Sequence, residues 1–375
     1  MTATATKPKS SRRGGGITMA TETLKQALID VSPAVPTRAP RPVLANVMLA
    51  GGALTATNLE LQIAADIEYH GDPLLLPHGR LLQILRETRA DEVTLTVDGS
   101  ACVVAAGRGT WRLPLGDPAE WPRWEAVNAK PLIRLPADQF ARAVRGTVYA
   151  TDNESSRFAL GAVLVEVSGA VCSFVATDGR RLSLVQCEHD QSVDDATALV
   201  PAHALQSMRI IAEQNKNESV QLEATSSELV ASMPGYTVLA RQIQGRFPPW
   251  RDVIPDRDGV SETVVARGDL MAATSAAKIV TSEQSKGVEF TFSESGVTLH
   301  GQSSEYGTSD VTIDVVSGGE PVKVKLDPEF VIAWLKGLTS EDDPNVTLEL
   351  VDPQSACILR SGEDCTGVIM PMAAD

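Results

Sequence analysis

The feature that most constrains the fold is a pattern that occurs three times along the chain, at a period of roughly 120 residues. In each copy a helical segment is followed by strand-like segments with glycine turns, a second helical segment and more strands. The first helices are predicted at residues 21–31, 137–149 and 268–281, and the second at 77–89, 201–214 and 328–338. Because 375 residues are too many for one hydrophobic core, we predict an α+β fold of three similar domains.

The strand-like segments give the predicted domains their boundaries. They are expected at 43–67 and 92–115, at 158–186 and 219–243, and at 288–315 and 345–371. Residues 1–16 are rich in Thr, Ser, Gly and Lys, which predicts a disordered tail. The domains are then expected at 17–130, 131–260 and 261–375. The second helices begin at Pro or Asp-Pro, which suits a first helical turn.

Composition excludes several classes of protein. No apolar run approaches the ~20 residues that span a bilayer, and no apolar segment follows the basic N-terminus as in a secretory signal. We therefore expect a cytoplasmic protein. The five cysteines form no CxxC pair and are odd in number, which favours buried, reduced thiols. The histidines are scattered, so we expect neither a metal site nor a cofactor.

Charge gives two opposing indications about nucleic acid. The formal net charge is −15, whereas a protein that grips DNA over its whole surface is normally basic. However, the polar faces of the predicted helices are basic, and an acidic chain with basic helix faces indicates one localised anionic partner. The basic residues on these faces are Arg80, Arg86, Arg142, Arg145, Arg209 and Lys278.

Catalytic patterns are sparse. Ser275 and Lys278 match the SxxK of serine acyl-transferases, but neither a Ser-Asp-Asn nor a Lys-Thr-Gly accompanies them. No GxSxG, no GxxxxGK[ST] and no GxGxxG after a strand is present. The sequence therefore gives little support for an enzyme.

Two stretches do not follow from the repeat alone. The first, Thr177-Asp178-Gly179-Arg180-Arg181-Leu182, predicts a hairpin corner, because Gly tolerates positive φ and Asp bonds its own backbone. The second is the apolar end of the chain, Val368-Ile369-Met370-Pro371-Met372. We expect the end to pack beside the corner.

The triple repeat, the Ala-Thr-Asp-Gly-Arg-Arg-Leu corner, the connector Gly245-Arg246-Phe247-Pro248 and the Met-Pro-Met end occur in that order. Together they resemble the bacterial β sliding clamp family, the processivity subunits of replicative DNA polymerases, over residues 17–375. The resemblance implies three clamp domains in a crescent, and two crescents that close into a homodimeric ring around duplex DNA. A ring is held by topology, so its exterior can be acidic while basic helices line the hole.

The resemblance also implies positions for several residues. Besides the basic helix residues, Arg38, Arg157 and Phe158 match positions that touch DNA. Trp111 and Leu113 match one side of the dimer contact, and Ile279 and Val280 the other. Ile279 also stands out because it falls on the polar side of its helix.

Partner proteins of the family insert a short motif, typically a Gln followed by Leu and Leu-Phe, into a pocket between the second and third domains. The expected partners are the replicative polymerase, other polymerases, repair proteins and a separate ATP-driven loader. The matching pocket positions are Leu160, Thr177, Gly179, Arg180, Arg181, Leu182, Pro248, Val253, Val368, Ile369, Met370, Pro371 and Met372.

The chain departs from the family pattern at three places: Arg180 replaces a His of some relatives, Asp252 follows Arg251 where a basic residue is common, and the chain ends in Ala373-Ala374-Asp375. These departures concern the rim of the pocket and the choice of partner. Two alternatives stay open from the residues: an acyl-transferase that uses Ser275 and Lys278, and a repeat scaffold that binds peptides without DNA.

Overall fold

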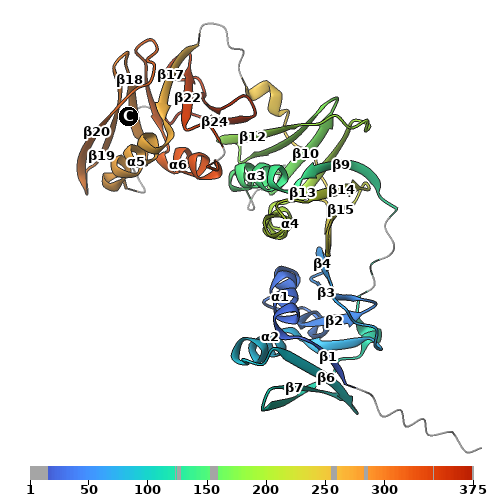
Figure 1. Ribbon diagram of the computed structural model, residues 1–375. Helices are drawn as coiled ribbons and strands as arrows, with labels where there is room; N and C mark the ends of the chain where they lie inside the picture. The colour runs from blue at the N-terminus through green and yellow to red at the C-terminus, as the bar shows by residue number, and fades with distance from the viewer. Residues whose placement is uncertain are drawn as a thin grey trace, which may run out of the picture. The chain divides into compact units, whose positions relative to one another are not determined.

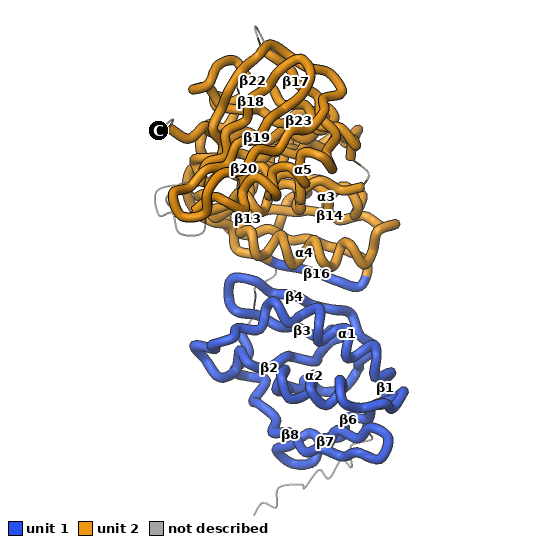
Figure 2. The backbone as a smooth tube through the Cα atoms, turned by 90° about the vertical axis from the view of Figure 1, so that its left-hand side faces the viewer, with its two compact units in different colours: residues 1–126, 235–239 blue, residues 127–234, 240–375 orange. Residues whose placement is uncertain are grey.

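A computed structural model describes residues 16–122, 124, 128–152, 159–254, 260–282, 286–340 and 342–373. They group into two compact units, one within residues 1–126 together with 235–239, the other within 127–234 and 240–375 (Figure 2). Of the predicted tail, only Gly16 is among the described residues. The division into three domains with boundaries near 130 and 260 stays a prediction.

The first unit contains two helices that lie side by side, α1 (Thr21–Val31) and α2 (His78–Glu87) (Figure 1). One sheet has the order β1-β6-β7-β8, and β5, β2, β3 and β4 pair in that order in another. The strands are β1 (Ile17–Ala20), β2 (Asn46–Ala50), β3 (Ala53–Thr57), β4 (Leu61–Asp66), β5 (Leu74–Pro77), β6 (Glu92–Asp98), β7 (Ala101–Ala106) and β8 (Gly109–Pro114).

The second unit repeats this set of elements twice. Its helices pair as α3 (Ala137–Thr147) with α4 (Ala202–Gln214) and α5 (Arg267–Ala277) with α6 (Pro328–Gly337). The strands up to residue 241 are β9 (Lys130–Pro136), β10 (Ala162–Ser168), β11 (Val171–Thr177), β12 (Arg181–Glu188), β13 (Ala196–Pro201), β14 (Ser219–Ala224), β15 (Glu228–Met233) and β16 (Tyr236–Arg241), of which 236–239 group with the first unit. The later strands are β17 (Ser261–Ala266), β18 (Val288–Phe292), β19 (Gly296–Ser303), β20 (Gly307–Asp314), β21 (Lys323–Leu326), β22 (Asn345–Leu350), β23 (Cys357–Ser361) and β24 (Cys365–Ile369).

Strand order confirms the repeat and the α+β class. The order β5-β2-β3-β4 recurs as β13-β10-β11-β12 and as β21-β18-β19-β20. Within the second unit, β12 also pairs with β24, which joins β13-β10-β11-β12 to β24-β23-β22-β17 in one eight-stranded sheet. This junction brings the predicted corner against the chain's end.

The helix predictions are correct to within a few residues, and their errors have a local cause. Pro77 and Pro201 were expected inside the first turn, but each ends the preceding strand in an extended conformation. Of the three prolines at these helix starts, Pro328 alone stands in a first turn, where the Asp327 carboxylate accepts the Glu329 N–H at 2.9 Å. The helix predicted at 137–149 ends two residues earlier, because Tyr149 lies in a 3₁₀ turn, Val148–Ala150, where its hydroxyl donates to Ser183.

Aliphatic side chains dominate the cores, since only 4% of the residues of the chain are aromatic. In α3, Phe140 and Val144 are fully buried while Arg142 and Arg145 are partly exposed, so the predicted two faces of this helix are correct. All five cysteines are buried and none of them is part of a disulfide, so the prediction that they are buried is confirmed. Within the described residues, no helix is long and apolar enough to cross a membrane.

Candidate functional site

The predicted corner is a tight turn between β11 and β12. Gly179 has φ +87°, a conformation that residues with a Cβ rarely adopt. The Asp178 carboxylate accepts the N–H groups of Arg180 and Arg181 at 2.9 and 3.0 Å, and the Thr177 hydroxyl accepts the Gly179 N–H at 3.0 Å. The sequence thus fixes the corner through its own side chains.

The chain's end lies beside the corner, as predicted. Strand β24 pairs antiparallel with β12, with Leu182 opposite Val368, and the Met370 N–H donates to the Arg180 carbonyl at 2.9 Å. Leu182 and Val368 are nearly fully buried in a small cluster that also contains Trp250. Burial of this cluster holds the two stretches together.

A cavity of about 250 Å³ opens beside the corner and is called the corner cavity below. Ten predicted pocket residues line it: Leu160, Thr177, Gly179, Arg180, Arg181, Leu182, Pro248, Val253, Val368 and Met370. Most of its wall is apolar, and Met370 and Val253 remain 43% and 41% exposed at its mouth. A site of this kind binds a few apolar side chains.

Sequence reasoning missed Trp250, which lines the cavity and is 7% exposed. It begins a 3₁₀ turn, Trp250–Val253, directly after Pro248 and Pro249. Arg251 stacks over its ring at 4.1 Å and pairs with Glu166 at 2.9 Å. The signal was available, because this tryptophan stands only two residues after the connector Gly245-Arg246-Phe247-Pro248 that carries part of the family resemblance.

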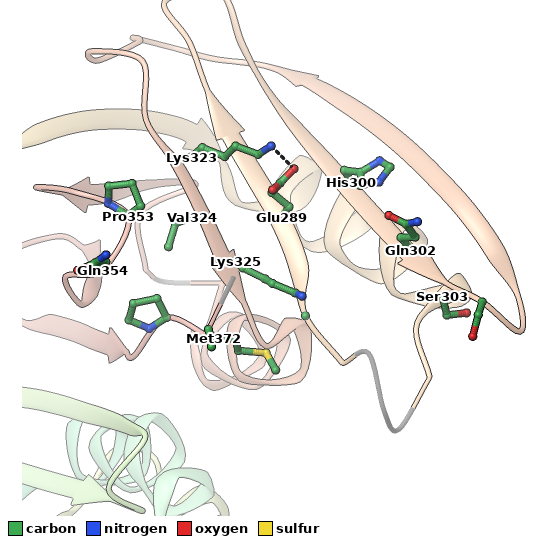
Figure 3. Close-up of a pocket in the computed structure, with 14 residues that line it drawn as sticks. Glu289, His300, Gln302, Ser303, Lys323, Val324, Lys325, Pro353, Gln354 and Met372 are labelled. Carbon is green, nitrogen blue, oxygen red and sulfur yellow. Dashed lines mark ion pairs between the residues drawn. The ribbon is translucent and has the colours of Figure 1, made fainter. Parts of the chain in front are cut away.

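Three predicted pocket residues do not line the corner cavity. Ile369 is 2% exposed and packs into the core of the last repeat, because successive strand residues point to opposite faces. Pro371 and Met372 line a separate, larger groove (Figure 3). These three positions therefore lie outside the corner cavity, and their contact with partners stays a prediction.

The two arginines of the corner differ in their surroundings. Arg181 is half-buried, and its guanidinium donates to Asp178 at 3.0 Å and to the Tyr149 carbonyl at 2.6 Å. It also lies 4.5 Å from the centre of the Phe330 ring. Arg180 is exposed and lies over the same ring at 5.1 Å. Arg181 therefore braces the fold, whereas Arg180 offers its charge at the rim.

The predicted DNA-facing cations fall into two groups. Arg38, Arg80 and Arg86 are exposed. In the other group, each cation pairs with a carboxylate: Arg145 and Arg209 share Glu213, and Lys278 pairs with Glu329 at 2.6 Å. Arg157 and Phe158 lie outside the described residues. The polar helix faces are thus less positive than their basic residues alone indicate.

Arg142 belongs to a half-buried ion-pair network. It contacts Asp342 and Asp364, each at 2.5 Å, and the Asp342 side chain is fully buried. The hydrogen bond to Asp364 is the largest influence on Arg142 and raises its pKa. Burial acts to raise the pKa of Asp342, but hydrogen bonds from Thr339 and Arg142 outweigh it and lower that pKa. This arginine links α3 to the last repeat, and its charge is already balanced.

The four predicted interface residues differ in exposure. Ile279 is 75% exposed in a 3₁₀ turn, Lys278–Val280, and Val280 is half-buried. Trp111 is half-buried on β8, and Leu113 is 8% exposed in the core of its own unit. Leu113 thus offers little exposed surface, and the part of all four residues in a dimer contact stays a prediction.

The predicted acyl-transferase pair finds no support in the geometry. The ammonium group of Lys278 is bonded to Glu329 rather than to Ser275. A general base must lie within hydrogen-bond reach of its nucleophile, so Lys278 in this position does not activate Ser275.

The chain was compared with known families and proteins. Models of the DNA polymerase III beta subunit match nearly its whole length: the N-terminal domain at residues 16–125, the central domain at 134–249 and the C-terminal domain at 251–373. The Beta sliding clamp of Haemophilus influenzae is 25% identical over 94% of this chain and 98% of its own length. That of Synechococcus elongatus is 27% identical over 85% of this chain and 89% of its own.

Solved structures show the same fold at low identity. A sliding clamp from Pseudomonas aeruginosa bound to griselimycin has a TM-score of 0.89 at 23% identity and covers 96% of this chain and 100% of its own. The clamp from Bacillus subtilis has a TM-score of 0.87 at 19% identity, with 96% and 99% covered. Because the family models cover far more than half of the sequence, the chain belongs to the DNA polymerase III beta subunit family.

Proposed function

We propose that this chain is a DNA sliding clamp: two copies close into a ring around duplex DNA and tether the replicative polymerase and other replication and repair proteins to it. It is a processivity subunit without chemistry of its own, acting in the cytoplasm through three domains, 17–130, 131–260 and 261–375. The observation that carries the tethering role is the corner cavity, an apolar site at the junction of β12 and β24.

The corner cavity suits the Leu and Phe anchors of a short Gln-containing motif. Its buried wall of Leu182, Val368 and Trp250 is apolar, and Met370 at the mouth is flexible and polarizable. Two or three anchors contribute ~1.5–3 kcal/mol each, against association costs of ~4–15 kcal/mol. Binding of an isolated peptide should therefore be weak, on the order of micromolar, which lets partners exchange.

A head-to-tail dimer is supported by two sheet edges. Strand β8 ends the sheet β1-β6-β7-β8, and β20 ends the sheet β20-β19-β18-β21. Edge strands readily pair with another chain. Arg108 lies directly before β8 and Asp314 at the end of β20, so the two edges carry opposite charges, while Arg112 on β8 and Asp310 on β20 already pair with Asp98 and His300 of the same chain. The exposed Ile279 adjoins the second sheet through contacts of its 3₁₀ turn with β19 and β20.

Contacts with DNA are proposed to be sequence-independent, through Arg38, Arg80 and Arg86 and, more weakly, through the paired cations. Phosphate contacts of this kind carry no base information. Because the sequence contains no GxxxxGK[ST] motif, a separate ATP-driven protein must open the ring.

The test is retention on circular DNA. The protein is loaded onto a nicked circle by a clamp loader with ATP, unbound protein is removed, and half of the sample is linearised. We expect retention on the circle and loss from the linear molecule. Equal retention on both would refute the ring. Light scattering should also give about 80 kDa, twice the 39.9 kDa of one chain.

A further inference from the structure

Strand β1 leaves one side of its backbone open. It ends the sheet β1-β6-β7-β8, so it pairs on one side only, with β6 (Figure 1). Thr21, the residue after β1, donates its N–H to the Asp91 carbonyl at 2.8 Å, and hydrogen-bonded pairs alternate along antiparallel strands. The N–H and C=O groups of Met19 therefore point to β6, whereas those of Thr18 and Ala20 point away from the sheet.

The other two repeats contain the same strand in the same geometry. Ala137 after β9 and Arg267 after β17 donate their N–H groups to the residue just before β14 and β22, as the residue after β1 does to the residue just before β6. Three residues before these donors stand Arg134 and Val264, and in the first repeat Thr18. The three residues are thus equivalent, and the main-chain groups of each face outward.

In the second and third repeats this outward position is covered. The Arg134 N–H donates to the side-chain oxygen of Gln191 at 3.0 Å, and its carbonyl accepts the Gln191 side-chain N–H at 2.6 Å. Val264 donates its N–H to the Ser317 carbonyl at 2.9 Å. Both covering residues follow the strand that is equivalent to β4, in the loop before the next strand. Among the described residues, none forms such a hydrogen bond with the main chain of Thr18.

A groove of about 590 Å³, called the edge groove below, takes the place of this cover in the first repeat. One of its sides is β1, Ile17–Ala20, and the other is the segment after β4, which supplies Ile67, Glu68 and His70. Glu68 is exposed and forms no ion pair with a described residue. The edge groove therefore combines a free strand edge with a carboxylate whose charge is not balanced.

We propose that residues 9–13, Lys9-Ser10-Ser11-Arg12-Arg13, add to β1 as an antiparallel strand in the edge groove. Only Gly14-Gly15-Gly16 separates them from β1, and loops of three to five residues that contain Gly reverse a chain into a hairpin. Five extended residues span about 17 Å, which is enough to follow the four residues of β1. Strand addition uses main-chain groups, so a segment without apolar residues can take part. The proposal is independent of the ring and of the corner cavity.

Charge and covalent linkage favour this occupant over a separate molecule. The segment carries Lys9, Arg12 and Arg13 and no acidic residue, and the edge groove offers Glu68. A nucleic acid would bring its phosphates to this carboxylate instead. A segment tethered by three residues also has an effective concentration on the order of millimolar at the groove. The covers of Arg134 and Val264 likewise come from the same chain.

The test measures hydrogen–deuterium exchange of single amides in the full-length protein, by mass spectrometry with electron-transfer fragmentation. Wild type is compared with Ser11→Pro/Arg12→Pro, because proline has no N–H to donate to a strand. The matched control, Ser11→Ala/Arg12→Lys, keeps both N–H groups and the charge. We expect the Thr18 and Ala20 amides to exchange about tenfold faster in the proline variant than in wild type, and within about twofold of wild type in the control. Fast exchange of both amides in wild type would overturn the proposal.

The Met19 amide is the internal reference, because its N–H points to β6. It should exchange at the same rate in all three proteins. If Met19 exchanges faster together with Thr18 in the proline variant, β1 itself has opened, and loss of a cover is not the cause. Slow exchange of Thr18 and Ala20 in all three proteins would mean that another occupant, such as a second copy, covers the edge. Either result overturns the proposal.

Discussion

Met370 gives the sharpest test of the corner cavity. The residue lines the mouth of the cavity and is 43% exposed, so a bound peptide has a large apolar surface to cover there. Full burial of a Met side chain is worth about 1.5–3 kcal/mol, and 43% of that is about 0.6–1.3 kcal/mol. Met370→Ala should therefore weaken the binding of a labelled Gln-Leu-Ser-Leu-Phe peptide about threefold to ninefold. Its backbone hydrogen bond to Arg180 is independent of the side chain, so the end of the chain keeps its place beside the corner.

The assay is fluorescence anisotropy on wild type and variants, with thermal unfolding to check that each is folded. Met372→Ala is the matched control, since it is the same substitution two residues further along the chain and outside the corner cavity. We expect this control to bind the peptide within about twofold of wild type. An equal loss for both variants, or no loss for Met370→Ala, would refute the assignment of the cavity.

Three further predictions concern stability, assembly and the thiols. Asp342→Asn should destabilise the fold by about 2–4 kcal/mol near neutral pH, because it breaks a buried ion pair with Arg142. Because the pKa of Asp342 is lower in the folded protein, its stabilising contribution is present above the unfolded pKa of about 3.9 and is lost as pH falls through the folded pKa. Urea unfolding of wild type and variant at neutral and at acidic pH checks this, and a stability difference between them that does not change with pH would contradict it. Ile279→Glu should shift the mass in light scattering from a dimer towards 39.9 kDa, and an unchanged dimer would count against this interface. A thiol reagent at mildly alkaline pH should label native protein slowly and all five cysteines after unfolding, because burial raises the pKa of Cys187 and Cys365 to about 12; rapid native labelling would disagree.

Local patterns were enough to predict the elements. Residues 21–31 were expected to be helical and form α1 with the same bounds, because apolar residues recur there at helical spacing. The predicted corner is also correct, since Asp178 and Gly179 determine the turn by themselves. The starts of the second helices were less predictable, because a proline suits both a strand's last residue and a first helical turn.

The wall of the cavity was predicted less well because a continuous stretch was assigned to it. In β24 and the residue that follows, Val368 and Met370 line the corner cavity, whereas Ile369 between them packs into the core. The two-residue period of a strand gives this alternation from sequence alone. The partners of the basic helix residues were harder to foresee. Asp342 and Asp364 are some two hundred residues from Arg142, and only the fold brings them together.

The shared carboxylate of Glu213 bears on how an acidic clamp would move along DNA. Arg145 and Arg209 both pair with it, so a phosphate must compete with a counter-ion that is already in place. Such contacts are weak, which favours sliding as long as topology prevents escape. Glu213→Gln should therefore tighten binding to linear duplex DNA about threefold to tenfold at low salt and steepen the salt dependence.

Glu218→Gln supplies the control for this prediction, because it changes the net charge equally at an exposed position just beyond α4. If only net charge mattered, the two variants would bind linear duplex equally well, and the argument from paired cations would fail. If the pairing matters, Glu213→Gln alone should bind more tightly, and on loaded circles it should diffuse more slowly than Glu218→Gln. The paired cations would then set the friction between ring and DNA, while closure of the ring sets how long it stays.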